Sequence, residues 1–207
     1  MARVSAQTRL ETRDRLLEAA ARHFAEHGLE PASVDSIAVS AGCAKGTLYN
    51  YFASKEELFA EVVSEACRRA VERFRAVPDR ESLREQLVAL AAADVLVLRE
   101  QEGFTKVLVR EALGFRPATY ALIVEHLSAY VGCVETLLRK GVMDGEIRGD
   151  RPSGQLALLF VGMLSLLFVQ HWGSDGAWPT LDEIPELVVS MFLDGAAVRP
   201  QTTTRAP

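Results

Sequence analysis

Apolar residues recur three and four positions apart along almost the whole chain, in stretches that begin and end at helix-capping signals. Thr8, Ser54, Ser82 and Thr180 are each followed three residues later by a glutamate, which is the pattern of an N-terminal capping box. Strand-like alternation of apolar and polar residues is nearly absent. The sequence therefore predicts an all-α protein of about nine helices.

Glycine and proline divide this pattern into elements. A first helix is expected from about Thr8 to His27, because Gly28 is a good helix terminator. After Pro31, two short helices are expected on either side of Gly42, a residue that tolerates the positive φ of a tight turn. Helices are expected over residues 8–27, 33–41, 44–51, 54–76, from 82, after 103, and over 117–143, 152–172 and 180–198.

Charge is unevenly distributed along the chain. The 207 residues have a net charge of -5, but residues 1–75 carry 11 basic and 11 acidic side chains, whereas residues 76–207 carry 12 and 17. An acidic surface repels phosphate, so a nucleic acid partner would have to bind the neutral first third. We expect one domain over residues 1–55, a connecting helix over about 54–76, and a C-terminal helical domain over 77–207.

Cysteine usage and the apolar segments indicate the compartment. Cys43, Cys67 and Cys133 are odd in number and widely spaced, which fits a reduced cytoplasm and no disulfide framework. The N-terminus lacks an apolar signal core. The most apolar run, residues 156–169, is shorter than the roughly 20 residues that span a bilayer. We expect a cytoplasmic protein without membrane contact.

The sequence shows no signature of catalysis or of a cofactor. It contains no Gly-rich phosphate loop, no nucleophile elbow and no metal-ligand spacing. His23 and His27 are four residues apart, yet they lack a matching carboxylate and are interpreted as surface residues. Cys43 is interpreted as a small apolar residue in preference to a thiol sensor. We expect no enzyme activity, no cofactor and no metal.

The two short helices around Gly42 form the pattern of a helix-turn-helix. In the second of them, Leu48 and Phe52 share the inward face. The rest of its surface carries a cation, hydroxyls, an amide and two aromatic rings, from Lys45, Thr47, Tyr49, Asn50 and Tyr51. Such side chains bind phosphates and base edges, whereas the alternative, a hairpin within a core, would have to bury them.

The stretch from Ser33 to Leu58, Ser-Val-Asp-Ser-Ile-Ala-Val-Ser-Ala-Gly-Cys-Ala-Lys-Gly-Thr-Leu-Tyr-Asn-Tyr-Phe-Ala-Ser-Lys-Glu-Glu-Leu, resembles the DNA-binding signature of the TetR/AcrR family of transcriptional regulators. The end of the preceding helix, Phe24-Ala-Glu-His-Gly28, is similar to that family's first helix. The resemblance covers about residues 8–65. Beyond residue 65, the chain is similar to that family in its total length, in the order of its helices and in the Gly145-Glu-Ile-Arg turn. It implies a DNA-binding domain followed by a helical regulatory and dimerisation domain.

The resemblance also implies residue roles at the DNA. Phosphate contacts are expected from Ser33 and Lys55, major-groove contacts from Lys45, Gly46 and Thr47, backbone and base-edge contacts from Tyr49 and Tyr51, and an influence on sequence choice from Asn50. Two positions depart from the family pattern. Ala44 replaces a hydroxyl residue that would cap the second short helix, at a cost of about 1 kcal/mol. Cys43 replaces an aliphatic residue.

The last two helices are expected to form a four-helix dimer interface, as the resemblance implies. Its expected contributors are Leu156, Leu159, Phe160, Met163, Leu167, Val188, Met191 and Phe192, with Gly162 and Ser165 allowing close approach. A second set of mainly aromatic residues either lines a ligand pocket or closes the core. These residues are Phe104, Leu108, Phe115, Tyr120, Tyr130, Phe168, His171 and Trp172.

The function expected from these features is transcriptional repression. A homodimer would place two recognition helices about 34 Å apart on a near-palindromic operator. A small, mainly apolar ligand in the C-terminal domain would release it, with helix 54–76 as the connection between the domains. Two alternatives stay open at this point. One is a transcriptional activator with the same fold, and the other is a helical ligand-binding protein without sequence-specific DNA binding, for which Ala44 is the best support.

Overall fold

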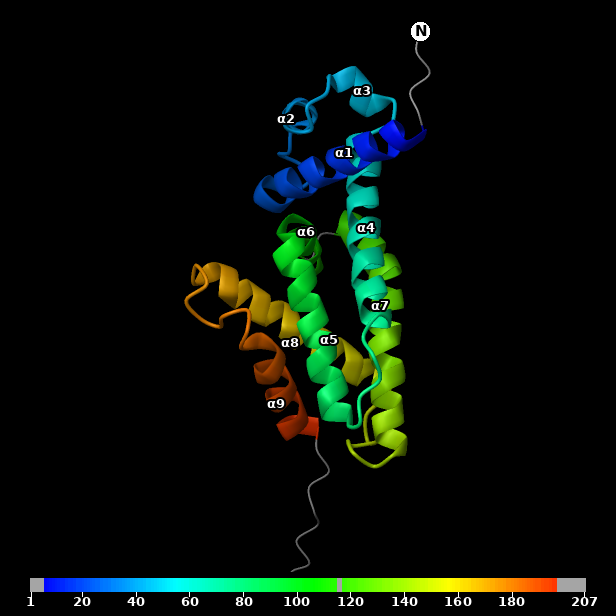
Figure 1. The fold of residues 1–207 in the computed structure, drawn as a ribbon, viewed down its shortest axis with the longest axis vertical. Coiled ribbons are helices and arrows are strands. Elements are labelled where there is room, and N and C mark those ends of the chain that lie inside the picture. The colour runs from blue at the N-terminus through cyan, green and yellow to red at the C-terminus, as the bar shows by residue number, and fades with distance from the viewer. Residues whose placement is uncertain (1–5, 115–116, 197–207) are drawn as a thin grey trace, which may run out of the picture. The chain divides into compact units, whose positions relative to one another are not determined.

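The computed structural model describes residues 6–114 and 117–196, and the side chains of all of these except 117–119, 122 and 196. Within them the chain is all-α, as predicted, with no strand (Figure 1). The helices are α1 (Ala6–His27), α2 (Val34–Ser40), α3 (Lys45–Tyr49), α4 (Lys55–Arg75), α5 (Leu83–Glu100), α6 (Glu102–Leu113), α7 (Pro117–Met143), α8 (Ser153–Gly173) and α9 (Ile184–Ala196).

Two of the predicted capping boxes close the start of a helix through side-chain bonds. At α4, Ser54 Oγ accepts from the Glu57 N–H at 3.0 Å, and the Glu57 carboxylate accepts from the Ala53 N–H. At α5, Ser82 Oγ accepts from the Glu85 N–H at 3.2 Å. These bonds satisfy N–H groups that have no partner inside the helix.

The other two predicted caps differ. Before α9, the Glu183 carboxylate accepts from the backbone N–H and the hydroxyl of Thr180, both at 2.8 Å, so the box forms one turn ahead of the helix. The prediction for Thr8 is wrong. Helix α1 begins at Ala6, and the Thr8 carbonyl accepts from the Thr12 hydroxyl at 2.8 Å inside the helix.

The chain divides into two compact units that do not follow simple sequence order. The first unit comprises residues 1–73 and 96–129, and the second comprises 74–95 and 130–207. Helices α5 and α7 each contribute to both. The helix-turn-helix segment therefore shares its unit with α6 and the first half of α7.

Helices α1 to α4 pack around a continuous apolar core in the first unit. Phe24 of α1 and Phe59 of α4 meet edge to face, with ring centroids 5.2 Å apart. Ile37 of α2, Leu48 of α3 and Phe52 after α3 are buried against them. Because α2 and α3 are too short to be stable alone, this packing holds both in place.

Helix α6 packs closely against α1 within the same unit. A Cβ placed on Gly103 would lie 3.2 Å from the Arg22 backbone nitrogen, so the two backbones touch at this crossing. Further along α6, the Arg110 guanidinium donates to the Ala25 and Glu26 carbonyls at 3.0 and 3.1 Å. These carbonyls belong to the last turn of α1, so a cation from α6 completes the C-terminal cap of α1.

The second unit is built from the first part of α5, the second part of α7, α8 and α9. Phe160 of α8 and Phe192 of α9 pack edge to face at 5.3 Å. The Tyr130 hydroxyl of α7 donates to the Asp94 carboxylate of α5. Burial raises the pKa of the Asp94 carboxyl to about 7, although the hydrogen bond from Tyr130 opposes this shift.

Among the described helices, α8 is long and apolar enough to cross a bilayer by length and composition alone. The apolar run that the sequence shows is shorter, but the helix around it extends to 21 residues. Buried helices outside membranes pass the same test. Only 28% of the apolar window of α8 is buried, so much of its apolar surface faces outward in this chain.

Candidate nucleic-acid interface

The helix-turn-helix begins with α2, which has a side-chain N-cap. Ser33 takes an extended conformation, and its Oγ accepts from the Ser36 N–H at 3.4 Å. The turn that follows α2 uses Gly42 at φ +70°, where a Cβ would be strained. The Cys43 N–H then donates to the Ala38 carbonyl at 3.0 Å, which closes the turn and leads the chain into α3.

Helix α3 presents polar and aromatic side chains around a buried ridge. Leu48 and Phe52 face the core, as predicted. Tyr49 is 45% exposed. Of the predicted DNA-contact residues of this segment, Lys45, Gly46, Tyr49 and Asn50 are exposed, whereas Thr47 and Tyr51 are half-buried.

The start of α3 lacks a side-chain cap. Ala44 occupies the N-cap position in an extended conformation, φ -76° and ψ 151°, and makes no side-chain bond to the helix. The helix spans residues 45–49, shorter than the expected 44–51. The Thr47 N–H donates to the Ala44 carbonyl at 2.8 Å instead.

The two lysines of the segment are already engaged. Lys45 Nζ lies 3.0 Å from an Asp35 carboxylate oxygen, and this hydrogen-bonded pair raises the pKa of the Lys45 ammonium. Lys55 Nζ donates to the Glu30 carbonyl at 2.8 Å and more weakly to that of Ala32 at 3.5 Å. Lys55 therefore holds the loop between α1 and α2 through hydrogen bonds to its carbonyl groups, a structural role that the sequence did not predict.

Two arginines of α1 lie against the recognition segment. The Arg9 guanidinium carbon is 6.0 Å from the Tyr51 ring centroid, and that of Arg13 is 5.9 Å from the Phe52 ring centroid. Arg13 also pairs with Glu61 of α4. The basic start of α1 thus supports the segment that follows α3, a contact over some forty residues that no local sequence signal indicates.

The residues expected at a ligand pocket occupy different environments. In the first unit, Phe104 is buried in the core with Leu108 packed beside it, whereas Tyr120 is 48% exposed. In the second unit, Tyr130 and Phe168 are buried. His171 and Trp172 are half-buried, His171 Nδ1 lies 2.8 Å from the Pro179 carbonyl oxygen, and Phe115 lies outside the described residues.

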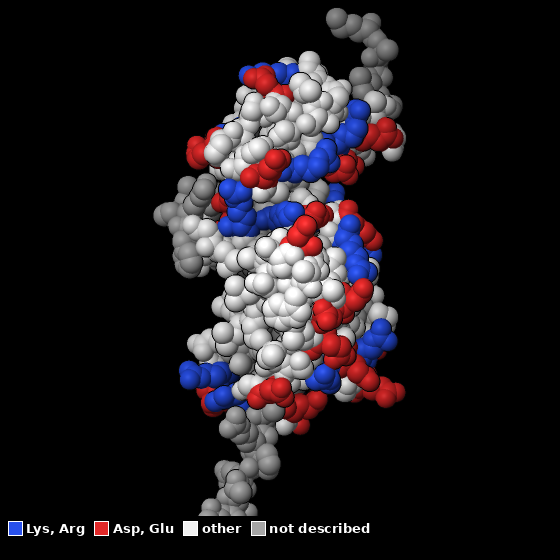
Figure 2. Space-filling view, turned by 90° about the vertical axis from the view of Figure 1, so that its left-hand side faces the viewer, with Lys and Arg blue, Asp and Glu red and all other residues white. Residues whose placement is uncertain are grey.

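The residues expected at a dimer interface divide into two groups. Four of them, Leu156, Phe160, Val188 and Phe192, are buried in the core of the second unit. Leu159 and Met191 are 60% and 61% exposed, and Met163 and Leu167 are half-buried. The sequence analysis did not include three further exposed residues of α8, which are Leu158, Leu166 and Val169. Figure 2 shows a broad area without charged side chains on one face of the molecule.

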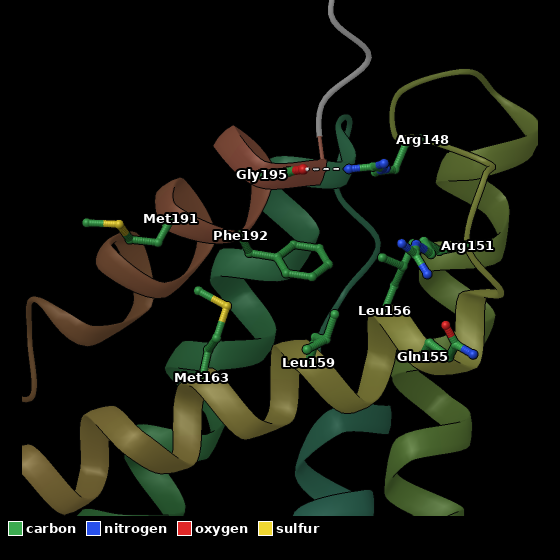
Figure 3. Close-up of a pocket in the computed structure, with 9 residues that line it drawn as sticks. All are labelled: Arg148, Arg151, Gln155, Leu156, Leu159, Met163, Met191, Phe192 and Gly195. Carbon is green, nitrogen blue, oxygen red and sulfur yellow. Dashed lines mark hydrogen bonds between the residues drawn. The ribbon is translucent and has the colours of Figure 1, made fainter.

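A groove lies between α8 and α9 in the second unit, with a volume of about 370 Å³ (Figure 3). Leu159 and Met163 rise from α8 toward Phe192 of α9 and form its apolar floor. Arg148 stands at one end, where it pairs with Asp150 and donates to the Gly195 carbonyl at 3.4 Å. The groove continues the exposed apolar surface of α8.

The described residues also bear on the metal hypothesis and on one of the three thiols. No three His, Cys, Asp or Glu side chains gather there in a way that could hold a metal ion. His23 Nε2 lies 2.8 Å from the Ser40 hydroxyl. Cys67 is buried, and burial raises the pKa of its thiol to about 12, so it stays protonated at neutral pH.

Comparison with known proteins decides the family. Residues 16–62 match the family model described as "Bacterial regulatory proteins, tetR family", and residues 80–196 match "Tetracyclin repressor-like, C-terminal domain". The chain belongs to the TetR family. It is therefore a DNA-binding transcriptional regulator, and the α2–α3 segment is the helix-turn-helix of this TetR-family protein.

Individual relatives agree with this assignment along most of the chain. The HTH-type transcriptional repressor KstR2 of Rhodococcus jostii (strain RHA1) is 30% identical over 198 residues, which cover 89% of this chain and 91% of KstR2. The solved structure of the fatty acid degradation regulator FadR from Bacillus halodurans is 25% identical, with a TM-score of 0.78 and 90% and 99% coverage. FadR from Bacillus subtilis in complex with stearoyl-CoA shares the fold at 22% identity, with a TM-score of 0.78 and 88% and 98% coverage.

Proposed function

We propose that this TetR-family regulator is a cytoplasmic repressor that binds a near-palindromic operator as a homodimer and leaves it when a small, mainly apolar ligand binds. The observation that carries the operator part is the surface of α3. Lys45, Tyr49 and Asn50 are exposed there around the buried Leu48. Side chains of these types reach phosphates and base edges in a major groove.

The proposed dimer uses α8 and α9. Leu158, Leu159 and Leu166 are each about 60% exposed on α8, and Met191 of α9 is 61% exposed. Monomeric proteins rarely leave so large an apolar surface in water. A second copy would cover these residues and the groove beside them, while the buried Phe160 and Phe192 support the interface from below. Dimerisation is also what lets two short recognition helices read two half-sites.

The ligand class is suggested by what related proteins are named for. One structural neighbour is a fatty acid degradation regulator, and another, a transcriptional regulator, was solved in complex with stearoyl-CoA. We propose a long-chain acyl-CoA, whose apolar part is its fatty acyl chain, as the first ligand to examine. The apolar helices of the second unit, which include the buried Phe168, would supply contacts for the acyl chain. Ligand and operator must weaken each other's binding by the same factor.

Operator binding is tested with a fluorescent DNA fragment from upstream of the protein's own gene, titrated at two salt concentrations. Wild type should bind with nanomolar affinity that falls steeply with salt. Tyr49→Ala should lose most of this affinity. Trp178→Ala is the control, because Trp178 is an aromatic residue that is 53% exposed in the second unit, which does not include α3. If both variants bind like wild type, α3 does not read the DNA as proposed.

A random-sequence selection resolves the case in which the upstream fragment is not bound. A preferred site from that pool would support a distant operator. No preferred site would favour the alternative of a helical ligand-binding protein that does not read sequence. Whether the operator overlaps the promoter or lies upstream of it then separates repression from activation, and a reporter gene under that promoter measures the difference.

The dimer is tested by sedimentation. Leu159→Asp places a charge in the proposed interface and should shift the protein toward monomer at micromolar concentration. Leu10→Asp is the control, since Leu10 is 58% exposed on α1. A dimer that survives Leu159→Asp but not Leu10→Asp would place the interface elsewhere.

Ligand release is tested by adding stearoyl-CoA to the protein–operator complex. A rise in the apparent operator dissociation constant of about 5- to 150-fold corresponds to a typical coupling between two sites. If neither stearoyl-CoA nor a broad panel of apolar ligands changes operator affinity, release by an apolar ligand is refuted while operator binding stands.

A further inference from the structure

An acidic side chain lies on the surface that carries the DNA-contact residues. Asp35 is in the first turn of α2, and its carboxylate oxygen is 3.0 Å from Lys45 Nζ, at the first residue of α3. The side chains of Asp35 and Lys45 are 65% and 51% exposed. Asp35 is also the acidic residue of the first turn of α2, where a negative charge is favourable.

The packing of α2 explains why Asp35 faces outward. Ile37 and Ala38 are buried on the inner side of α2, and Asp35, two residues before Ile37, lies on the opposite side of this short helix. Its carboxylate can therefore reach across the turn to α3. The ion pair thus joins the first turn of α2 to the first residue of α3.

Stability does not account for this pair. An exposed ion pair typically contributes little to folding. At a surface that approaches phosphates, an unneeded carboxylate weakens binding, because like charges repel. The cost is relevant here, since residues 1–75 carry equal numbers of acidic and basic side chains and have no excess positive charge to offset it. Besides its favourable place in the first turn of α2, an acid here aids DNA binding where it meets a hydrogen-bond donor on the DNA.

We propose that Asp35 is a specificity-determining residue that accepts a hydrogen bond from a cytosine amino group in the major groove, while Lys45 donates to the guanine paired with it. The inference rests on the proposed operator binding through α3. A C·G pair places cytosine N4, a donor, next to guanine O6, an acceptor. These two atoms are joined by a Watson–Crick hydrogen bond and lie about 2.9 Å apart. The Asp35 oxygen and Lys45 nitrogen are 3.0 Å apart and of the complementary kinds.

The neighbouring atoms distinguish C·G from A·T. An A·T pair also presents an amino group beside a carbonyl oxygen, but the next group along the groove is the thymine methyl. In a C·G pair the next group is guanine N7, a second acceptor. The Lys45 ammonium has three N–H donors, so it can use both O6 and N7 and gains nothing from a methyl group. The pair of side chains is therefore matched to C·G.

The experiment is a random-sequence selection with wild type, Asp35→Ala and Asp35→Asn, followed by affinity measurements on the selected sites. Wild type should select one C·G pair in each half-site, and replacing that pair should weaken binding on the order of 10- to 100-fold. Asp35→Ala should lose the preference at that position and keep the others. Asp35→Asn should change the preference toward adenine, because an amide both donates to N7 and accepts from N6.

Non-specific binding gives an independent readout. In Asp35→Ala, Lys45 is free to bind a phosphate, so affinity for unrelated DNA should rise several-fold at low salt and its log–log salt slope should steepen by about 0.9. Asp144→Asn is the control, since it makes the same net change of charge at an exposed turn of the second unit. This control should leave base preference and slope unchanged.

The outcomes separate this inference from the proposed function. If wild type selects an operator and Asp35→Ala retains every base preference, Asp35 does not read DNA and operator binding stands. If wild type selects no site at all, operator binding fails and the role of Asp35 falls with it.

Discussion

The two helices of the helix-turn-helix differ at their N-caps, and this difference predicts opposite effects of two small substitutions. Ser33 caps α2 through its hydroxyl, whereas Ala44 has no group with which to cap α3. Ala44 already has the extended backbone that an N-cap requires, φ -76° and ψ 151°. A hydroxyl introduced by Ala44→Ser can therefore accept from the N–H of Gly46 or Thr47 without a change of backbone.

The magnitudes follow from the geometry. An N-cap hydroxyl contributes about 0.5–2 kcal/mol, and typically about 1 kcal/mol. The Ser33 cap is 3.4 Å long and exposed, so Ser33→Ala should cost about 0.5 kcal/mol, near the lower end. Ala44→Ser should stabilise by about 1 kcal/mol. For a chain of this length that corresponds to a rise of about 2–4 °C in Tm. The added hydroxyl also lies where a phosphate would approach α3, so operator affinity should increase.

Thermal unfolding at one fixed protein concentration, followed by circular dichroism, measures both variants. Ala121→Ser is the control, because it makes the same chemical change at an exposed position inside α7 and should destabilise by a few tenths of a kcal/mol through helix propensity. The reasoning is refuted if Ala44→Ser lowers Tm as much as Ala121→Ser does.

Two further predictions concern packing and pH. Gly103→Ala should lower the free energy of unfolding in urea by about 1 kcal/mol, because the new methyl would lie 3.2 Å from the Arg22 backbone nitrogen. Gly132→Ala is the control: it has open space around it and should raise that free energy by up to about 1 kcal/mol. Equal effects of the two substitutions would contradict a tight crossing of α6 and α1. Because burial raises the pKa of Asp94 from 3.8 to about 7, the folded state keeps its proton over a range in which the unfolded state has lost it. The contribution of Asp94 to stability is thus complete below about pH 4 and is lost as pH rises to about 7, by about 1.4 kcal/mol per unit. Urea unfolding at pH 5 and 8 should show this loss in wild type and not in Asp94→Asn, and parallel losses would refute it.

Local signals predicted much of the fold. Ser54, Ser82 and Pro117 mark the starts of α4, α5 and α7 as expected, because capping and the fixed φ of proline act over a single turn. Thr8 misled the prediction, because a threonine inside a helix matches the same short pattern as one that caps it. The hydrogen bonds from Arg110 to the last turn of α1 were not predictable, since they join residues more than eighty positions apart.

The candidate sites were predictable to different degrees. Leu48 of α3 and Phe52 just after it marked the inner side of this segment, so the exposed residues of α3 followed from helical geometry. On α8, apolar residues occur all around the helix, so no periodicity separated the buried Phe160 from the exposed Leu158. The pairing of Asp35 with Lys45 depends on how α2 and α3 cross, and no spacing along the chain indicates it.

The close crossing of α6 over α1 sets a rule for exchanging parts between regulators of this family. A chimera joined near residue 75 would separate α1 from α6. It would thereby lose the backbone contact at Gly103 and the Arg110 guanidinium that caps the end of α1. In such a chimera, the C-terminal carbonyls of α1 would have lost the guanidinium of Arg110 that binds them. The compact unit that contains the helix-turn-helix is discontinuous in sequence and comprises residues 1–73 together with 96–129. A chimera that combines the DNA-binding domain of one regulator with the ligand-binding domain of another is therefore best built by moving both segments at once.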